Sequence, residues 1–148
     1  MSLKSIKSSN MGKYKKGYTT GVYDMFHIGH LNILKRAKEL CDELVVGVTT
    51  DELCFQRKKK YPIINQEERI EIVRAVRYVD KAVFQTDMDK FRMVKEMGAN
   101  VVFVGSDWKG TPAWNQYEKE FATIGCDVVY LEHTDGISSS ILREKLEK

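Results

Sequence analysis

The sequence lacks the features that mark several large classes of protein. Its formal net charge of +3 over 148 residues is too small to indicate a nucleic-acid or membrane binder by itself. No apolar run approaches a membrane span, and residues 1–10 lack the apolar core of a secretory signal. The three cysteines form no C-x-x-C pair, so we expect reduced thiols. We therefore expect a cytoplasmic protein with neither nucleic acid nor membrane as a partner.

Two common phosphate-binding signatures are also absent. The chain contains neither G-x-x-x-x-G-K-[ST] nor G-x-G-x-x-G, which excludes a P-loop enzyme and a dinucleotide-fingerprint protein. With 43% apolar and 30% charged residues, the composition is typical of a globular protein. Its length suits one domain with a substantial core. We expect a disordered Ser/Lys-rich tail or tag over residues 1–13 and a single domain over 14–148.

The chain does contain a regular alternation of strand-like and helix-like segments. Short β-branched or apolar runs occur at 17–23, 43–49, 78–84, 101–104 and 126–131. Helical spacing follows at about 29–41, 65–77, 87–97 and 112–124, with a last helix after Ser138, and residues 50–64 read as a lysine-rich loop. Asn65 and Asp87 are the expected N-caps of two of these helices. The alternation predicts an α/β fold, a single-domain Rossmann-like parallel five-stranded sheet with helices on both faces.

The least common residues fall where this sheet would bind a ligand. In such sheets, ligands bind outside the carboxyl ends of the strands. His27 and His30 follow the first strand, the basic run 57–60 follows the second, residues 105–108 follow the fourth and residues 133–140 follow the fifth. At the first turn, a strand leads tightly into a helix whose N-terminal N–H groups and dipole attract phosphate. We therefore expect an anion-binding active site at this edge.

Each of these features also has a simpler interpretation. The histidine pair could be polar side chains satisfied at a helix start, or could join His133 in binding zinc. The basic run could be a solvated loop, although four clustered cations beside a phosphate-binding turn favour an anion pocket. Residues 138–140 could serve only as a helix N-cap or could also hold a phosphate. Trp108 could pack against the fold or stack on a base.

Two motifs resemble those of a known family. Residues 27–30 read H-I-G-H, which is similar to the H-x-G-H signature of the nucleotidyltransferase superfamily. Residues 133–140 read H-T-D-G-I-S-S-S and resemble the R-T-E-G-I-S-T-T element of its cytidylyltransferase branch. The likeness runs from about Lys16 to the C-terminus. Residues 104–110 bring it nearest to the short bacterial glycerol-3-phosphate cytidylyltransferases, whereas residues 66–69 are shared with the choline-phosphate and ethanolamine-phosphate enzymes. His133 replaces the family arginine, and Asp135 replaces a glutamate.

The resemblance implies a reaction and partners. The enzyme would transfer a cytidylyl group from CTP to a small alcohol phosphate, foremost sn-glycerol 3-phosphate, giving CDP-glycerol and pyrophosphate. Mg²⁺ would be held mainly by the triphosphate, the protein would be a homodimer, and the product would serve teichoic acid or another surface polymer. Another acceptor, such as ethanolamine, choline or polyol phosphate, or ATP as donor, is the alternative. A catalytically idle nucleotide-binding protein is the third hypothesis.

The resemblance also assigns roles to individual positions. The catalytic residues would be His27, His30 and Lys59. The nucleotide would be bound by Gly21, Val22, Tyr23, Asp24, Gly29, Gly105, Asp107, His133, Thr134, Gly136, Ile137, Ser138 and Ser139. The acceptor phosphate would be bound by Arg57, Arg69, Arg77 and Lys90, with Arg92 as an alternative to Lys90.

Overall fold

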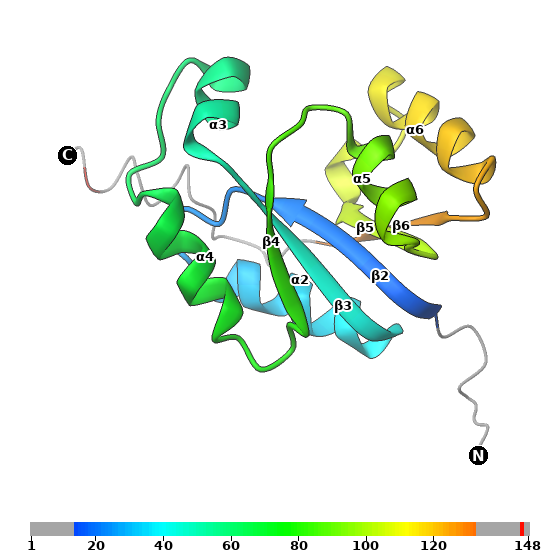
Figure 1. Cartoon of the computed structure of the whole chain (residues 1–148), viewed down its shortest axis with the longest axis horizontal. Helices are drawn as coiled ribbons and strands as arrows, with labels where there is room; N and C mark the ends of the chain where they lie inside the picture. The colour runs from blue at the N-terminus through cyan, green and yellow to red at the C-terminus, as the bar shows by residue number, and fades with distance from the viewer. Residues whose placement is uncertain (1–13, 133–145, 147–148) are drawn as a thin grey trace.

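A computed structural model of the chain describes residues 14–132 and residue 146. Within them, five parallel strands form one sheet in the order β4-β3-β2-β5-β6 (Figure 1). The strands are β2 (Tyr14–Gly21), β3 (Cys41–Thr49), β4 (Lys81–Gln85), β5 (Val101–Gly105) and β6 (Asp127–Leu131). The helices are α2 (Ile28–Glu39), α3 (Asp51–Lys58), α4 (Gln66–Arg74), α5 (Lys90–Met97) and α6 (Pro112–Ala122), with a 3₁₀ turn, η1 (Ser106–Trp108). The predicted parallel α/β sheet is confirmed.

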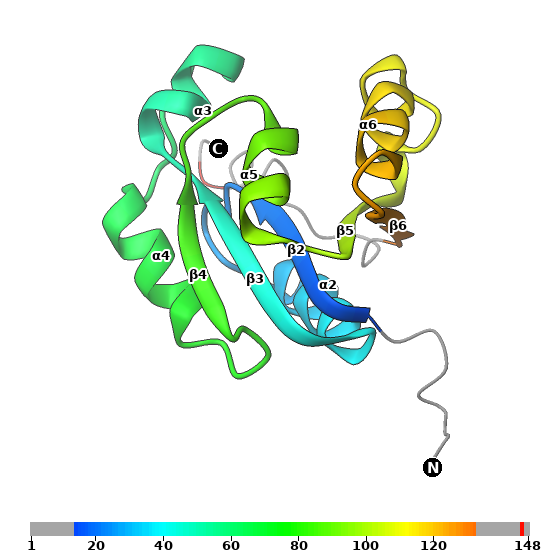
Figure 2. The same cartoon turned by 45° about the vertical axis from the view of Figure 1, so that its right-hand side comes forward.

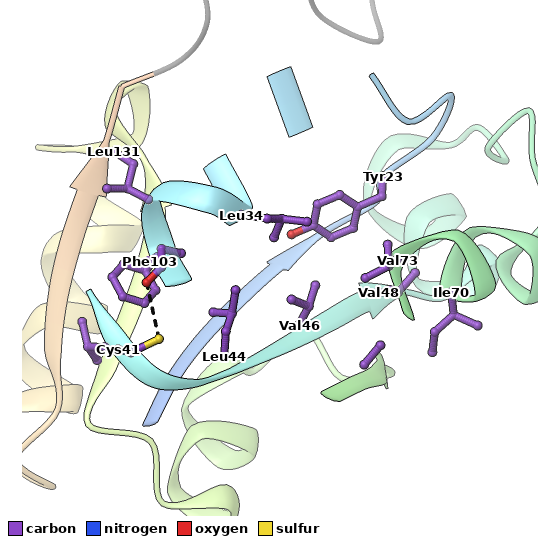
Figure 3. Close-up of a cluster of buried hydrophobic side chains, with 13 residues drawn as sticks. Tyr23, Leu34, Cys41, Leu44, Val46, Val48, Ile70, Val73, Phe103 and Leu131 are labelled. Carbon is purple, nitrogen blue, oxygen red and sulfur yellow. Dashed lines mark hydrogen bonds between the residues drawn. The ribbon is translucent and has the colours of Figure 1, made fainter. Parts of the chain in front are cut away.

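The helices cover both faces of the sheet. On one face α2 and α4 bury a cluster that includes Leu34, Val46 and Ile70, and Figure 3 shows the ring of Tyr23 directed into it beside Leu34. On the other face lie α5 and α6 (Figure 2). They bury a second cluster, which includes Val94 and Phe121. A parallel sheet covered in this way needs strands that are apolar on both sides, and β3 is almost continuously buried.

The order of the strands creates a reversal at β2. The chain passes from β2 to β3 and β4 on one side, then crosses back to place β5 and β6 on the other. The carboxyl ends of β2 and β5 therefore border the crevice at which doubly wound sheets bind ligands. The turn with both signature histidines follows β2, and η1 follows β5. The topology thus places two of the predicted site segments beside each other.

One stretch differs from the prediction. Residues 51–58, expected within a loop, form α3, which extends beyond the carboxyl end of β3 (Figure 1). The Thr50 side chain accepts a hydrogen bond from the Leu53 amide and caps the helix. Acidic residues occupy its first turn and Arg57 and Lys58 its last, which suits the helix dipole. The basic run therefore lies at a helix C-terminus, where Lys59 adopts a left-handed conformation with φ 61°.

Two helix starts can be compared with their predicted caps. Asn65 caps α4 as expected, because its side chain accepts a hydrogen bond from the Glu68 amide at 2.9 Å. Asp89, not Asp87, caps α5 through the Phe91 amide. Asp87, two residues earlier, instead accepts a hydrogen bond from the Asp89 amide at 2.9 Å. The last helix expected after Ser138 lies outside the described residues.

The described residues also bear on the cysteines and on membranes. Cys41, Cys54 and Cys126 are free thiols, as expected, and the structure shows that each is buried. Within the described part of the chain, no helix is long and apolar enough to cross a membrane.

Candidate active site

The turn between β2 and α2 has an unusual backbone. Tyr23 and Met25 both adopt positive φ angles, 57° and 51°, although neither is glycine. Such residues cost about 1–3 kcal/mol each and persist where the surrounding structure enforces them, often at functional sites. Tyr23 folds back so far that a Cβ atom on Gly21 would lie 2.9 Å from its ring. Gly21, predicted to bind the nucleotide, is therefore also required by packing.

The two histidines form a reciprocal cap at the start of α2. His27 is the N-cap, and its Nδ1 accepts a hydrogen bond from the Gly29 amide at 3.1 Å. His30 Nδ1 accepts one from the His27 amide at 3.2 Å. The rings stack with centroids 3.8 Å apart. Because both Nδ1 atoms accept hydrogen bonds from backbone amides, each neutral ring carries its own proton on Nε2, where it is a hydrogen-bond donor.

Packing keeps both imidazoles neutral. The Tyr23 ring meets His30 edge-on at 5.4 Å between centroids, and the Phe26 ring lies 5.2 Å away. Burial, with a smaller contribution from His27, lowers the pKa of His30 to about 4 despite the nearby Asp24 carboxylate. Burial also lowers the pKa of His27. At neutral pH the turn therefore presents two uncharged imidazoles at the positive end of a helix dipole.

Asp24 fixes a neighbouring segment to this turn. Its carboxylate is 3% exposed and accepts hydrogen bonds from the amides of Ile63 (2.8 Å) and Ile64 (2.9 Å). The chain between α3 and α4 is thereby held against the histidine turn. The sequence suggested Asp24 only as a nucleotide contact, and these two bonds could not be read from it because their partners lie about forty residues away.

Arg69, predicted to bind the acceptor, is buried instead. It is 1% exposed, and its Nη1 donates to the carbonyl oxygens of Val22 (2.6 Å) and Thr49 (2.8 Å). Its Nε donates to the Ile64 carbonyl at 2.8 Å, and its Nη2 pairs with Asp51 at 2.5 Å. The guanidinium thus joins the ends of β2 and β3 to the start of α3. A side chain so enclosed offers almost no surface to a substrate phosphate, and its bonds suit a residue that positions the strand ends.

Two other predicted acceptor residues meet at the carboxyl edge. Arg57 lies in the last turn of α3 and Lys90 opens α5. Burial, and then the positive charge of Arg57, lowers the pKa of Lys90 to about 8. The Lys90 ammonium also lies 5.9 Å from the centroid of the Tyr117 ring on α6. We call Arg57 and Lys90 the cation pair, since two positive charges held close together attract an anion.

Arg77 lies elsewhere. It follows the C-terminal end of α4, in the connection that leads into the beginning of β4, and it is exposed. The amide of Asp80 in this connection bonds the carbonyl of Leu44, in the first half of β3. This is the amino edge of the sheet, opposite the histidine turn. The structure therefore places Arg77 apart from the histidine turn, and its role in substrate binding stays a prediction.

The remaining predicted positions are divided between the described edge and the C-terminal segment. Lys59 is exposed just after α3, and Gly105 and Asp107 lie where β5 passes into η1. Trp108, beside them, is 43% exposed. The positions outside the described residues are His133, Thr134, Gly136, Ile137, Ser138 and Ser139.

The zinc alternative depends partly on one of those positions. Over residues 14–132 and 146, no three His, Cys, Asp or Glu side chains gather closely enough to hold a metal ion. His133, the third ligand of that alternative, lies outside the described residues.

Sequence inspection missed Tyr117 and Gln85 as neighbours of the cation pair. Tyr117 Oη donates to the Met88 carbonyl at 3.1 Å and accepts from the Lys90 amide at 3.4 Å. In the sequence Tyr117 stands at helical spacing from Trp114 and Phe121, which is the pattern of a core residue. Its place beside Lys90 follows only from the packing of α5 on α6.

Comparisons with known proteins agree with this architecture. The cytidylyltransferase-like family model matches residues 18–145. The chain is 35% identical over 133 residues to glycerol-3-phosphate cytidylyltransferase from Bacillus subtilis, covering 89% of this chain and 97% of the relative. It is 33% identical over 133 residues to FAD synthase from Archaeoglobus fulgidus, covering 87% and 96% respectively.

Solved structures show the same fold. A lipopolysaccharide core biosynthesis protein from Thermoplasma volcanium superimposes with a TM-score of 0.68 at 28% identity, over 82% of this chain and 97% of that one. The pantoate-beta-alanine ligase from Francisella tularensis does so with a TM-score of 0.58 at 14% identity, over 97% and 73%, which shows likeness of fold alone. From the family match and the relatives that it spans nearly end to end, this chain belongs to the cytidylyltransferase-like family of nucleotidyltransferases.

Proposed function

We propose that this chain transfers a cytidylyl group from CTP to a small alcohol phosphate, foremost sn-glycerol 3-phosphate, with release of pyrophosphate. The observation that carries the proposal is the stacked pair His27 and His30, which presents two neutral Nε2–H donors at the N-terminus of α2. The cation pair at the same edge supports it. The likeness to glycerol-3-phosphate cytidylyltransferases over 97% of their length supports the choice of acceptor.

The chemistry joins two anions. A phosphate oxygen of the acceptor attacks the α-phosphorus of CTP, the bond to the bridging oxygen breaks, and pyrophosphate leaves with the bonding electrons. Negative charge builds on the α-phosphate oxygens and on the leaving group in the transition state. Imidazole Nε2–H groups that are already fixed by backbone hydrogen bonds stabilise this charge without reorganising. No covalent intermediate with the protein is required, because positioning and charge neutralisation suffice.

The cation pair would hold the acceptor. Arg57 and Lys90 come from different helices, so a phosphate dianion between them would be bound by a cation on each side. Bound phosphate favours the protonated form of Lys90 and offsets the mutual repulsion of the two cations. Lys59, next to this pair in sequence, would neutralise the nucleotide phosphates. Asp24 and Arg69 would keep the histidine turn and α3 at a fixed separation.

Mg²⁺ would be bound mainly by the triphosphate, where it neutralises charge on the leaving pyrophosphate. The homodimer and the surface-polymer pathway implied by the resemblance stay predictions.

An FAD synthase activity is the second candidate. It would join an adenylyl group from ATP to flavin mononucleotide, which is also a phosphomonoester, so the chemistry is the same. One surface feature favours it: Phe55 and Tyr61 stack with centroids 4.6 Å apart beside the basic run, and they are 37% and 58% exposed. An exposed aromatic pair next to phosphate-binding cations offers a platform for a flavin ring.

A panel of substrates separates these functions. The full chain with Mg²⁺ is given CTP or ATP together with glycerol 3-phosphate, choline phosphate, ethanolamine phosphate or flavin mononucleotide, and pyrophosphate release is measured. We expect turnover with CTP and glycerol 3-phosphate, and the product mass of CDP-glycerol. Turnover confined to ATP and flavin mononucleotide would replace the proposal with the second candidate. Calorimetric binding of CTP without pyrophosphate release for any acceptor would support the idle protein.

A further inference from the structure

A polar pair is buried in the middle of the sheet, away from the histidine turn. Tyr18 on β2 and Gln85 at the end of β4 are 0% and 2% exposed, and the Tyr18 hydroxyl donates to Gln85 Oε1. The contact crosses β3 at Gly47, where a Cβ atom would lie 2.0 Å from the Tyr18 hydroxyl oxygen. Only glycine leaves room for the two side chains to meet. Burial raises the pKa of Tyr18, so the hydroxyl keeps its proton and remains a donor.

Gln85 passes this connection on to the loop that precedes α5. Its Nε2 donates to the Asp87 carbonyl at 2.5 Å. Tyr117 donates to the next carbonyl, that of Met88, at 3.1 Å. Two consecutive carbonyls of residues 86–89 are therefore held by side chains from different elements. This loop delivers Lys90, so its conformation decides where the ammonium lies.

The main chain of Gln85 holds the other half of the cation pair. Its carbonyl accepts a hydrogen bond from the Thr50 amide at 3.2 Å, and Thr50 is the N-cap of α3. One residue thus bonds the start of the helix that carries Arg57 and the loop that carries Lys90. Apolar residues would fill the same space between the strands without the cost of burying polar groups. We therefore explain the buried Tyr18–Gln85 pair by the two segments that Gln85 holds, the start of α3 and the loop before α5.

We propose that Gln85, oriented by Tyr18, is a positioning residue that sets the distance between Arg57 and Lys90 and so tunes affinity for the acceptor phosphate. The inference rests on the proposed function in taking the cation pair as the acceptor site. Gln85 is itself buried and touches neither substrate. We expect its effect to fall mainly on the acceptor, because its hydrogen bonds among the described residues run to Tyr18 within β2, to the start of α3 and to the loop before α5.

The test compares a single with a double substitution. Gln85→Leu removes both side-chain bonds and leaves the Tyr18 hydroxyl buried without its partner, so the variant should be less stable. Gln85→Leu combined with Tyr18→Phe replaces both partners with apolar groups, which is close to neutral for stability. We expect the acceptor KM to rise about tenfold in both variants, because displacement of Lys90 would cost one charge-assisted contact with the acceptor phosphate. The nucleotide KM and kcat should stay within about twofold. Gln116→Leu, on the exposed face of α6, is the matched control.

A second measurement does not depend on turnover. Acetic anhydride labelling of Lys90 at several pH values, read by peptide mass spectrometry, should show half-maximal reactivity near pH 8 in the wild-type chain. In the double variant the midpoint should move to higher pH as the loop loosens and Lys90 moves away from Arg57. If no acceptor is turned over, the proposed function fails while the labelling still tests the inference. A folded double variant with an unchanged labelling midpoint, or with an acceptor KM back at the wild-type value, would overturn it.

Discussion

The histidine turn and the cation pair are held in place by different kinds of contact. His27 and His30 are oriented by backbone amides no more than three residues away. Arg57 and Lys90 come together only because α3, α5 and α6 pack around the ends of β3 and β4. Local hydrogen bonds fix the orientation of the two imidazoles within the turn. Tertiary contacts make the second adjustable, which suits a site that must distinguish one acceptor from another.

Substitution of Arg69 should break both regions together, because its guanidinium joins the ends of β2 and β3 to α3. Arg69→Met leaves the carbonyl oxygens of Val22 and Thr49 without their donor and Asp51 without its partner. We expect the free energy of unfolding to fall by about 3–5 kcal/mol, measured by urea denaturation at neutral pH. Arg74→Met on the same helix is the control, since its exposed pair with Glu71 should contribute less than about 1 kcal/mol. An equal loss of unfolding free energy in the two variants would contradict the role of Arg69 in joining the strand ends to α3.

Substitution of the histidines should separate helix capping from catalysis. His27→Ala should lower kcat about 10²–10³-fold, the loss expected for one preorganised donor, and should lower stability by about 1 kcal/mol through the lost cap. His27→Asn restores a side-chain acceptor for the Gly29 amide but supplies no Nε2–H. It should recover stability while kcat stays low, as thermal unfolding and initial rates would show. Losses of kcat below about tenfold for both His27→Ala and His30→Ala would contradict the mechanism.

Acid should weaken the histidine turn. The pKa of His30 is lowered in the folded chain to about 4 from 6.5, so the unfolded chain binds more protons between these values. The contribution of neutral His30 to the free energy of unfolding should therefore be fully present above about pH 6.5. It should decrease as the pH drops towards 4, by up to about 3 kcal/mol. His30→Gln lacks this titration, so the difference between the two urea-denaturation curves isolates it from the carboxylates. A constant difference across this range would show that His30 titrates normally.

Removal of one member of the cation pair should weaken binding of the acceptor and leave binding of the nucleotide unchanged. Arg57→Ala should raise the acceptor KM about tenfold and leave the nucleotide KM unchanged. Because the charge of Arg57 helps to lower the pKa of Lys90, its removal should also raise that pKa. The weakening of acceptor binding at alkaline pH, followed as KM against pH, should then begin at higher pH. Lys58→Ala, one residue along on the exposed surface, should leave both the KM and its pH dependence as in the wild type.

Where sequence reasoning succeeded, the deciding contacts were short-range. The Asn65 cap acts within one helical turn, since its side chain accepts a hydrogen bond from the Glu68 amide. The strands were predicted from short runs in which apolar residues alternate with polar ones or follow one another without interruption. The turn that carries both histidines was found in the same way, as a strand leading tightly into a helix.

Where sequence reasoning failed, a neighbour distant in sequence decided the outcome. The lysine-rich stretch reads as a loop, yet Leu53 and Cys54 are buried and Thr50 caps α3. Arg69 looks like any helix-surface arginine until its partners, more than ten residues away for three of four bonds, are known. Arg77 lies only eight residues from Arg69, but α4 spans the sheet between its two edges and separates them.

The amino-acid sequence by itself determined the strand–helix alternation, the parallel sheet and the histidine turn, because each depends on residue types at short spacing. Only the tertiary structure decided which cations meet, which charged side chains are buried, and how the Tyr18–Gln85 contact reaches the loop before Lys90. The physical reason is that a side chain's charge state and role depend on burial and on partners. In this fold, elements far apart in the chain supply both.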